Sequence, residues 1–148
     1  CAVAAEHPLA TYAANAARAR DDLAALDVEL RSSLAPLAGK PFVVLHDAYG
    51  YFTSHYGLPP AIPVSLGDAS TPSAARLAET RARVTAEAAV CAFPEANHDP
   101  SLIATVIEGT PIREGAALDP EGTLLPPGPD HYPETLRALA QALRGCLG

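Results

Sequence analysis

The chain has 148 residues, of which 49% are apolar and 18% charged, and its net charge is −7. This length and composition predict one folded domain with a core of its own and exclude an intrinsically disordered chain. The negative charge excludes a surface that neutralises nucleic-acid phosphates. The sequence contains neither an apolar run of membrane-spanning length nor a basic-then-apolar leader, so we expect any export signal to have been removed already.

The first third of the chain has the period of one long amphipathic helix. Apolar residues recur at steps of three and four from Leu9 to Leu37. Pro8 suits the first turn, and Pro36 and Gly39 end the pattern, so we expect a helix of about 28 residues, roughly 40 Å long. Such a length is more typical of a strut or a coiled-coil partner than of one layer in a small α/β unit.

Beyond Lys40, short apolar runs alternate with helical patterns. This alternation predicts an α/β fold, with four mostly parallel strands and helices on both faces. Pro63 restricts the second run to a sheet edge or a bulge, and Gly115 interrupts the fourth run. The expected strands are 41–45, 61–66, 90–93 and 112–118; the expected helices are 46–56, one opened by Thr71 and Pro72, one opened by Asp99 and Pro100 and closed by Gly109, and 132–146.

Polar residues that follow the predicted strands are the candidates for a functional site. Ligands of open parallel sheets bind at the carboxyl ends of the strands. The residues at these positions are His46, Asp47, Asp68, Glu95 and Asp119. Dinucleotide, P-loop and hydrolase-elbow motifs are absent, so no enzyme signature accompanies them.

His46 is the most informative of these residues. A neutral imidazole can donate a nitrogen lone pair to a transition metal, and Asp119 would add an oxygen from a neighbouring strand. A hydrogen-bonded structural role is the alternative for His46. Asp47 could simply cap the helix that follows it, and Glu95 could face either the site or solvent. A capping role is also expected for Asp99, and solvated side chains are expected for His7, His55, His98 and His131.

Four stretches of the sequence, taken in order, resemble the carboxy-terminal lobe of the periplasmic zinc-binding proteins of ABC importers, the ZnuA-like family. They are PFVVLHDAYGYFTSHYGL, TPSAARLAETRARV, CAFPEANHDPSLIATVIEGT and ALDPEGTLLPPGPDHYPETLRALAQAL. The preceding segment, TYAANAARARDDLAALDVELRSSLAPLAGKPF, is similar to the latter part of the rigid helix that joins the two lobes. The resemblance implies that residues 1–39 are part of this linker helix and residues 40–148 the α/β metal-binding lobe.

The resemblance also implies a metal site. In this family a tetrahedral zinc lies between the lobes, with His46 at the position of the one imidazole ligand from this lobe and Asp119 at that of an oxygen ligand which water can replace. Manganese-carrying relatives tend to have a carboxylate in place of His46, so the imidazole favours zinc. The order FPEANHDP departs from the usual Glu-Pro order, which leaves the role of Glu95 open. Without the other lobe's histidines, only weak zinc binding is expected.

Two expectations concern the cysteines. The resemblance implies a disulfide between Cys91 and Cys146, as an oxidising periplasm allows, with two buried free thiols as the alternative. Cys1 is either the first residue of a fragment or the first residue of a lipoprotein after signal cleavage.

The function that the resemblance implies is zinc capture without catalysis, with delivery to the membrane permease of an ABC importer. The missing amino-terminal lobe is then the main partner, and the isolated lobe could form a homodimer through its uncovered apolar surface. Two other functions remain open. One is a small α/β enzyme that uses His46 and Asp47 as acid-base groups, and the other is a structural or interaction fragment without a metal role.

Overall fold

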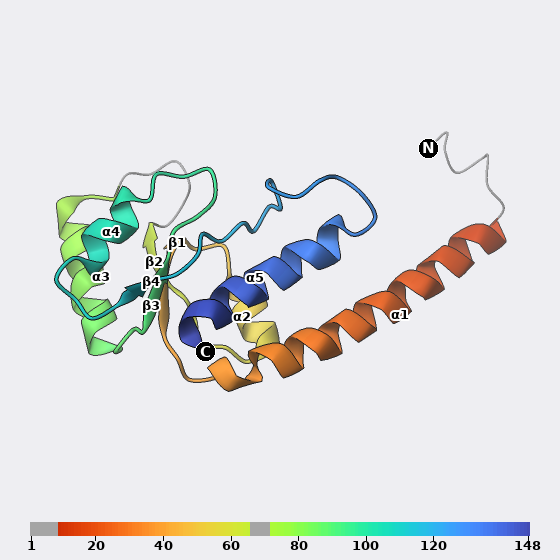
Figure 1. The fold of residues 1–148 in the computed structure, drawn as a ribbon, viewed down its shortest axis with the longest axis horizontal. Coiled ribbons are helices and arrows are strands. Elements are labelled where there is room, and N and C mark those ends of the chain that lie inside the picture. Colours follow the sequence, from red (N-terminus) through yellow and green to blue (C-terminus); the bar gives the residue numbers. More distant parts are fainter. Residues whose placement is uncertain (1–8, 66–71) are drawn as a thin grey trace.

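The computed structural model describes residues 9–65 and 72–148, and it has a four-stranded parallel sheet between two groups of helices (Figure 1). The predicted α/β fold is therefore confirmed. Five residues singled out from the sequence lie outside the described residues: Cys1, His7, Pro8, Asp68 and Thr71. The elements in chain order are α1 (Leu9–Leu34), η2 (Ala35–Leu37), β1 (Phe42–His46), α2 (Gly50–Tyr56), β2 (Ile62–Ser65), α3 (Ala74–Ala86), β3 (Cys91–Phe93), α4 (Ser101–Ile107), β4 (Arg113–Glu114) and α5 (His131–Leu147).

The sheet has the order β2-β1-β3-β4, and every pairing is parallel. β1 is central and its residues 42–45 are all buried, as the apolar run FVVL requires of a strand covered on both faces. β2 lies at an edge, where the sheet tolerates Pro63 as expected. His46 is the last residue of β1 and pairs with Ser65, so it lies at the carboxyl end of the central strand.

β4 is shorter than the sequence predicts. A strand was expected over residues 112–118, but only Arg113 and Glu114 belong to it. At Gly115 the chain passes so close to Phe93 that a β-carbon there would lie 2.3 Å from the ring. The chain returns to the sheet further on, where Leu118 forms a single parallel bridge with Glu95. The amide of Gly115 still donates to the carbonyl of Ala92, so the pairing with β3 is interrupted between Gly115 and Leu118.

Alternate side chains of β1 divide between two cores, one on each face of the sheet. Phe42 and Val44 belong to the core beneath α1, α2 and α5. Val43 and Leu45 belong to the core beneath α3 and α4. Figure 1 shows the same division, with α3 and α4 on one side of the sheet and α2 and α5 on the other.

Only the second half of α1 packs on the lobe. Leu26, Leu30 and Leu34 are buried in the core, whereas residues 11–25 are all exposed. Figure 1 shows this first half extending away from the sheet. The predicted helix is confirmed as far as Leu34, and Pro36 lies in the 3-10 turn that follows. Within the described ranges, no helix is both long enough and apolar enough to cross a membrane.

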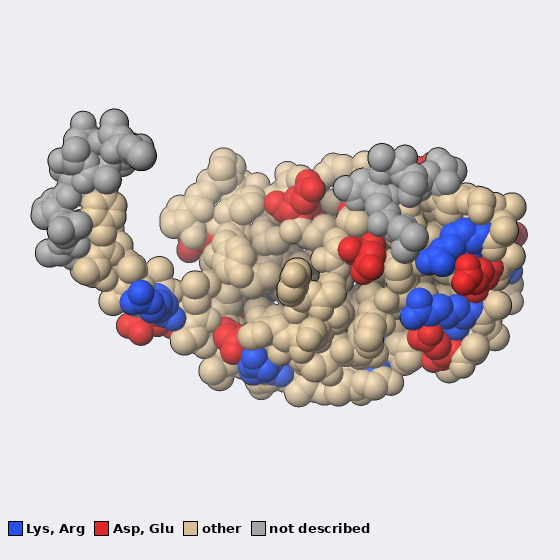
Figure 2. Space-filling model, turned by 180° about the vertical axis from the view of Figure 1, so that it is seen from behind, with Lys and Arg blue, Asp and Glu red and all other residues tan. Residues whose placement is uncertain are grey.

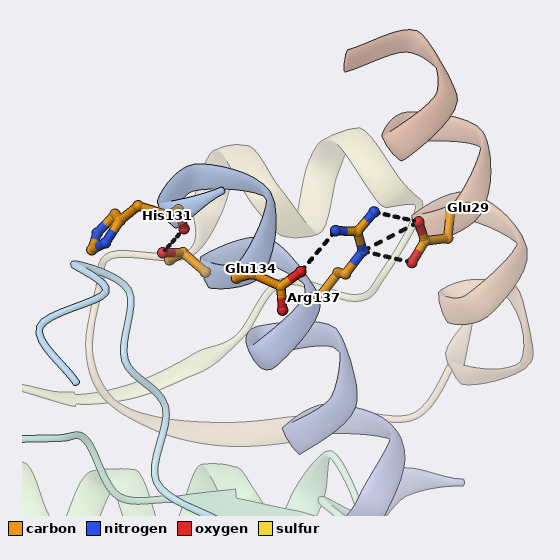
Figure 3. Close-up of polar contacts among 5 residues, drawn as sticks. Glu29, His131, Glu134 and Arg137 are labelled. Atoms are coloured by element: carbon orange, nitrogen blue, oxygen red, sulfur yellow. Dashed lines mark hydrogen bonds and ion pairs between the residues drawn. The ribbon is translucent and has the colours of Figure 1, made fainter. Parts of the chain in front are cut away.

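Arg137 of α5 joins the lobe to α1 (Figure 3). Its guanidinium donates through Nε and Nη2 to the carboxylate of Glu29 on α1, with an Nη2–Oε2 distance of 2.9 Å, and through Nη1 to Glu134. The hydrogen bond from Arg137 is the main reason that the pKa of Glu29 lies below its usual value. The long helix therefore has a polar attachment to α5 in addition to its apolar one.

The disulfide that the resemblance implies is present between Cys91 of β3 and Cys146 of α5, with a Cα–Cα distance of 6.2 Å. Two cations also hold the end of α5. Lys40 Nζ donates to the carbonyl of Leu147 at 2.5 Å, and the guanidinium of Arg113 donates to the carbonyl of Cys146. The last turn of α5 is therefore connected to three points around the sheet.

The helix starts differ in detail from those expected. Ser73 caps α3, because its hydroxyl accepts a hydrogen bond from the amide of Arg76 at 3.2 Å. Asp99 lies one residue before the N-cap position of α4, which Pro100 occupies without a side-chain cap, but its carboxylate accepts a hydrogen bond from the amide of Ser101, the first residue of the helix. The capping role considered for Asp47 is wrong. A turn follows β1, and α2 begins only at Gly50, so Asp47 lies too far upstream and its side chain is exposed.

Seen from the opposite side, acidic and basic side chains lie next to one another at the end of the molecule formed by α3, and the middle of the face is mostly uncharged (Figure 2). Two of the ion pairs on α3 join Arg76 to Glu79 and Arg83 to Glu87. Pairs of this spacing on an exposed helix contribute little to stability.

Candidate metal centre

The carboxyl ends of three adjacent strands bring His46, Glu95 and Asp119 to one edge of the sheet. His46 ends β1, and Glu95 lies two residues beyond β3, the neighbour of β1. The bridge between Glu95 and Leu118 places Asp119, the next residue, beside this extension of β3.

Glu95 is the buried centre of this group. The residue is only 7% exposed, and its Oε2 atom accepts a hydrogen bond from the hydroxyl of Tyr49 at 2.9 Å. The same oxygen lies 2.9 Å from Nδ1 of His46. The other oxygen, Oε1, lies 3.5 Å from Nε2 of His98. A buried carboxylate needs such partners, because transfer out of water is otherwise costly.

His46 lies with its Nδ1 atom against the carboxylate of Glu95. Its side chain is 15% exposed. The rings of Tyr49 and His98 flank it, with ring centroids at 6.3 Å and 6.2 Å. Burial, followed by the negative charge of Glu95, raises the pKa of Tyr49 far above its ordinary value, so the hydroxyl remains a neutral donor. A partly buried imidazole at the end of a central strand is a residue type that can ligate a transition metal.

Asp119 has a second role that the sequence did not reveal. Its Oδ1 accepts from the amide and hydroxyl of Thr123, and its Oδ2 accepts from the amide of Leu124 at 2.8 Å. Burial works to raise the pKa of Asp119, but these hydrogen bonds outweigh it and the pKa is lowered. Gly122 adds a further backbone hydrogen bond, so local donors occupy most of the roughly four acceptor positions of this carboxylate. Its charge also contributes to the raised pKa of Tyr49, which places it in electrostatic range of the group.

In residues 9–65 and 72–148, no group of three or more His, Cys, Asp and Glu side chains is arranged to hold a metal ion. A tetrahedral zinc shell needs four donors, so His46 and Asp119 could supply at most part of one. Donors from elsewhere would have to complete it.

The structure also separates His46 from the acid-base partner considered in the enzyme hypothesis. The carboxylate against His46 is that of Glu95, whereas Asp47 is exposed. The role of Glu95, which the sequence left open, is thus a contact with the candidate ligand. His98 was expected to be solvated, but it also approaches Glu95; the only sequence signal for this contact is their spacing of three residues.

A second polar group lies between α1 and α2. His55 Nε2 lies 2.5 Å from Oδ1 of Asp27, and Arg31 donates to the other oxygen of Asp27 at 2.9 Å. The hydrogen bond with His55, followed by that from Arg31, lowers the pKa of Asp27. An open groove of about 860 Å³ runs beside this group between α1, α2 and α5, and most of its lining is apolar or aromatic.

Comparisons with known proteins agree with this architecture. The family model described as "Zinc-uptake complex component A periplasmic" (ZnuA) matches residues 4–146. The chain is 69% identical over 137 residues to the high-affinity zinc uptake system protein ZnuA of Paracoccus denitrificans, covering 93% of the chain and 42% of that protein. It is 39% identical to the protein of the same name from Brucella abortus, again over 93% of the chain and 41% of the relative. The chain thus spans about two fifths of the length of these curated relatives.

Solved structures share the fold. A crystal structure of ZnuA superposes with a TM-score of 0.75 at 25% identity, covering 93% of this chain and 48% of that one. The Fe(III)-bound YtgA of Chlamydia trachomatis superposes with a TM-score of 0.79 at 18% identity, covering 93% of this chain and 52% of that one. At that identity, the second likeness concerns the fold alone.

Proposed function

Because the chain belongs to the ZnuA family of periplasmic zinc-uptake components, we propose that it is the carboxy-terminal lobe of a solute-binding protein that captures zinc for an ABC importer. In this proposal residues 1–39 are part of the helix that connects two lobes, and residues 40–148 form the metal-binding lobe. The partners are an amino-terminal lobe and the membrane permease. The place of action is the periplasm, and the role is transport without catalysis.

The observation that carries the proposal is the environment of His46. It ends the central strand, and a buried carboxylate lies against its Nδ1 atom. A histidine ligand of zinc usually has its second nitrogen against a carboxylate or a carbonyl in this way. Zinc is here the transported substrate, and the donors we assign to this lobe are the imidazole of His46 and a carboxylate oxygen of Asp119.

The donor set supports zinc over manganese. Imidazole suits zinc, whereas manganese prefers carboxylate and water oxygens. The fold alone does not select the metal, because similar structures are named for bound Fe(III), Mn and Cd. With two donors at most, the lobe by itself should bind zinc weakly and reversibly.

A calorimetric zinc titration of the 148-residue chain, metal-stripped and oxidised, tests this proposal. The variants are His46→Ala, Asp119→Ala and, as a matched control, His131→Ala on α5. We expect saturable weak binding by the wild type and the control, a reduced affinity for Asp119→Ala, and no binding by His46→Ala.

Equal binding by the wild type and His46→Ala would contradict the assignment and favour a fragment without a metal role. Absence of saturable binding by the wild type would contradict it as well. Circular dichroism of each variant verifies that the fold is kept, so that a loss of binding is assigned to the missing side chain.

A further inference from the structure

We propose that the disulfide between Cys91 and Cys146 is a site of thiol–disulfide exchange, in which a small thiol attacks Sγ of Cys146 and Cys91 leaves as a thiolate beside Arg113. The bond joins β3 to the last turn of α5. Its reaction with a thiol is separate from the proposed capture of zinc and does not depend on it.

The two cysteines differ in their access from solvent. Cys91 is 0% exposed, because β3 lies between β1 and β4 and its cysteine packs in the core beneath α5. Cys146 is 8% exposed, and it lines an open groove of about 600 Å³ between α5 and the segment 113–117. Among the described residues that line this groove, Cys146 is present and Cys91 is not. A thiol that enters the groove therefore reaches Cys146 first.

The lining of the groove suits a small, uncharged thiol. The volume lies in the usual range for sites that take small molecules. One cation and one anion line the groove, Arg113 and Glu114, so it favours neither sign of charge. Most of the other lining residues are small and leave room near the bond: Gly115, Ala116, Ala117, Ala138, Ala142 and Gly145.

Arg113 makes Cys91 the better leaving group. The two residues are direct neighbours in the parallel ladder of β3 and β4. Nη2 of Arg113 lies 3.9 Å from Sγ of Cys91, and the same nitrogen donates to the carbonyl of Cys146, which holds the guanidinium beside the bond. A neighbouring guanidinium stabilises a thiolate, and a stabilised thiolate leaves faster in exchange.

The reaction conserves atoms and electrons without any further oxidant or reductant. The thiolate of the small molecule forms a new sulfur–sulfur bond with Cys146. The bond to Cys91 breaks, and its electron pair leaves with Cys91 as a thiolate. A second thiolate can then attack the small-molecule sulfur of the adduct, which releases Cys146 as a thiolate and yields the disulfide of the small thiol.

The first step is reversible, because the end of α5 has other attachments to the sheet. Lys40 donates to the carbonyl of Leu147 at 2.5 Å, and Arg113 donates to the carbonyl of Cys146. These hydrogen bonds do not need the disulfide. They keep Cys146 close to Cys91 after the bond opens, so the Cys91 thiolate can attack the adduct and restore the original bond.

The experiment maps the first product of the reaction in the folded, metal-free 148-residue chain. Cys1 is blocked with iodoacetamide, and 2-mercaptoethanol is added without denaturant at about pH 8, where a thiol is partly ionised. Samples are quenched with acid at short times, free thiols are alkylated with N-ethylmaleimide, and peptides are analysed by mass spectrometry. We expect mercaptoethanol on Cys146 and N-ethylmaleimide on Cys91.

Three variants test the role of Arg113. Arg113→Gln should open the bond several-fold more slowly than the wild type, and Arg113→Lys, which keeps the positive charge, should recover most of the rate. Arg144→Gln is the matched control, because it removes the same charge from an exposed residue of α5 and should react like the wild type. An unchanged or higher rate in Arg113→Gln would overturn the assignment of Arg113 as the group that stabilises the leaving thiolate.

Two single-cysteine variants test the difference in access independently, since both lack the disulfide. Cys146 in Cys91→Ala should react with the aromatic disulfide 5,5′-dithiobis(2-nitrobenzoic acid) about tenfold or more faster than Cys91 in Cys146→Ala, because partly exposed thiols react and buried ones are inert. Equal rates would contradict the difference.

In the wild type, mercaptoethanol on Cys91, or on both cysteines equally, would overturn the proposal even if no variant folded. A disulfide that survives in the folded chain under an excess of thiol that opens it in urea would overturn it as well.

Discussion

Gly115 follows the fourth strand at a position where a side chain would meet the core. A β-carbon at this position would lie 2.3 Å from Cε1 of Phe93, a ring that is completely buried. The ring cannot move without displacing other core side chains, because Phe93 is completely buried. We therefore expect Gly115→Ala to lower the free energy of unfolding by about 1–3 kcal/mol, the usual cost of overpacking a core.

Urea denaturation of Gly115→Ala measures this effect, and Gly128→Ala is the matched control, because a β-carbon at residue 128 meets nothing within 4 Å. Equal midpoints for Gly115→Ala and the control would show that the glycine is not required by the packing of Phe93.

The lowered pKa of Asp119 leads us to expect that the folded chain loses stability in acid. Its pKa is lowered in the folded chain, because the hydrogen bonds from Leu124 and Thr123 outweigh the effect of burial. A carboxyl group with a lowered folded pKa stabilises the fold above its unfolded pKa of about 4, and this contribution disappears as the pH falls through the folded value. Between pH 6 and pH 3, the wild type should therefore lose more stability than Asp119→Asn.

Urea midpoints at several pH values measure this difference. The other carboxyl groups titrate in both proteins, so their effects cancel in the comparison. Parallel curves for the wild type and Asp119→Asn would show that the loop donors do not favour the ionised form.

Individual site residues could be predicted only in part from the sequence. Strand-end positions and a family resemblance singled out His46 and Asp119, and the structure places both at one edge of the sheet. The contact of Glu95 with His46 joins residues 49 positions apart through the register of β1 and β3, and no sequence spacing encodes that register. Asp47 was weighed as a cap and as an acid-base partner because of its sequence position, but the turn after β1 leaves it exposed.

At the level of elements, α1 combines a buried half with an exposed half. Leu30 is 1% exposed in the core, whereas Leu23, two turns earlier on the same helix, is 48% exposed. We expect Leu30→Ala to lower the free energy of unfolding by about 2–5 kcal/mol, the range for a leucine removed from a core. Leu23→Ala should change it by less than about 0.5 kcal/mol.

Chemical denaturation of the two variants compares the same substitution in the same helix. A large loss of stability in Leu23→Ala would contradict the division of α1, because it would require a packing partner for that half of the helix in the isolated chain.

The disulfide between Cys91 and Cys146 connects β3 to the last turn of α5. The two cysteines are 55 residues apart, and on the chain-entropy model a loop of that size stabilises the fold by about 4 kcal/mol. A Cys91→Ala/Cys146→Ala variant should lose about that much in the free energy of unfolding.

Alkylation of the unfolded wild type followed by mass measurement provides the independent check. Without a reductant one of the three cysteines, Cys1, should react, and after reduction all three should react. Three alkylated cysteines without reduction would contradict the bond.

The helices and strands could be predicted where the sequence has a sustained helical repeat of apolar residues, as for α1 and α5, or a continuous apolar run, as for β1. It failed where tertiary contacts decide the outcome. β4 has only two residues, and α3 is capped by Ser73 rather than at Thr71 and Pro72.

At the scale of the whole molecule, the chain is a lobe with surface that it does not cover itself. The first half of α1 is exposed, and the groove between α1, α2 and α5 carries the exposed rings of Tyr51 and Tyr132. The candidate metal centre is also incomplete, because the described residues supply less than a full set of ligands. Both features agree with the proposal that a second lobe completes the protein, and self-association of the isolated chain would be the other way to cover this surface.

The central claim is that this lobe contributes to zinc binding through the imidazole of His46. The most direct measurement is a zinc titration of the 148-residue chain followed by the imidazole ¹⁵N signals of its five histidines. The account predicts that the imidazole signals of His46 change first and saturate, while the signals of His55 and His131 stay constant. A response of another histidine before His46, or no response of His46 at saturating zinc, would contradict it.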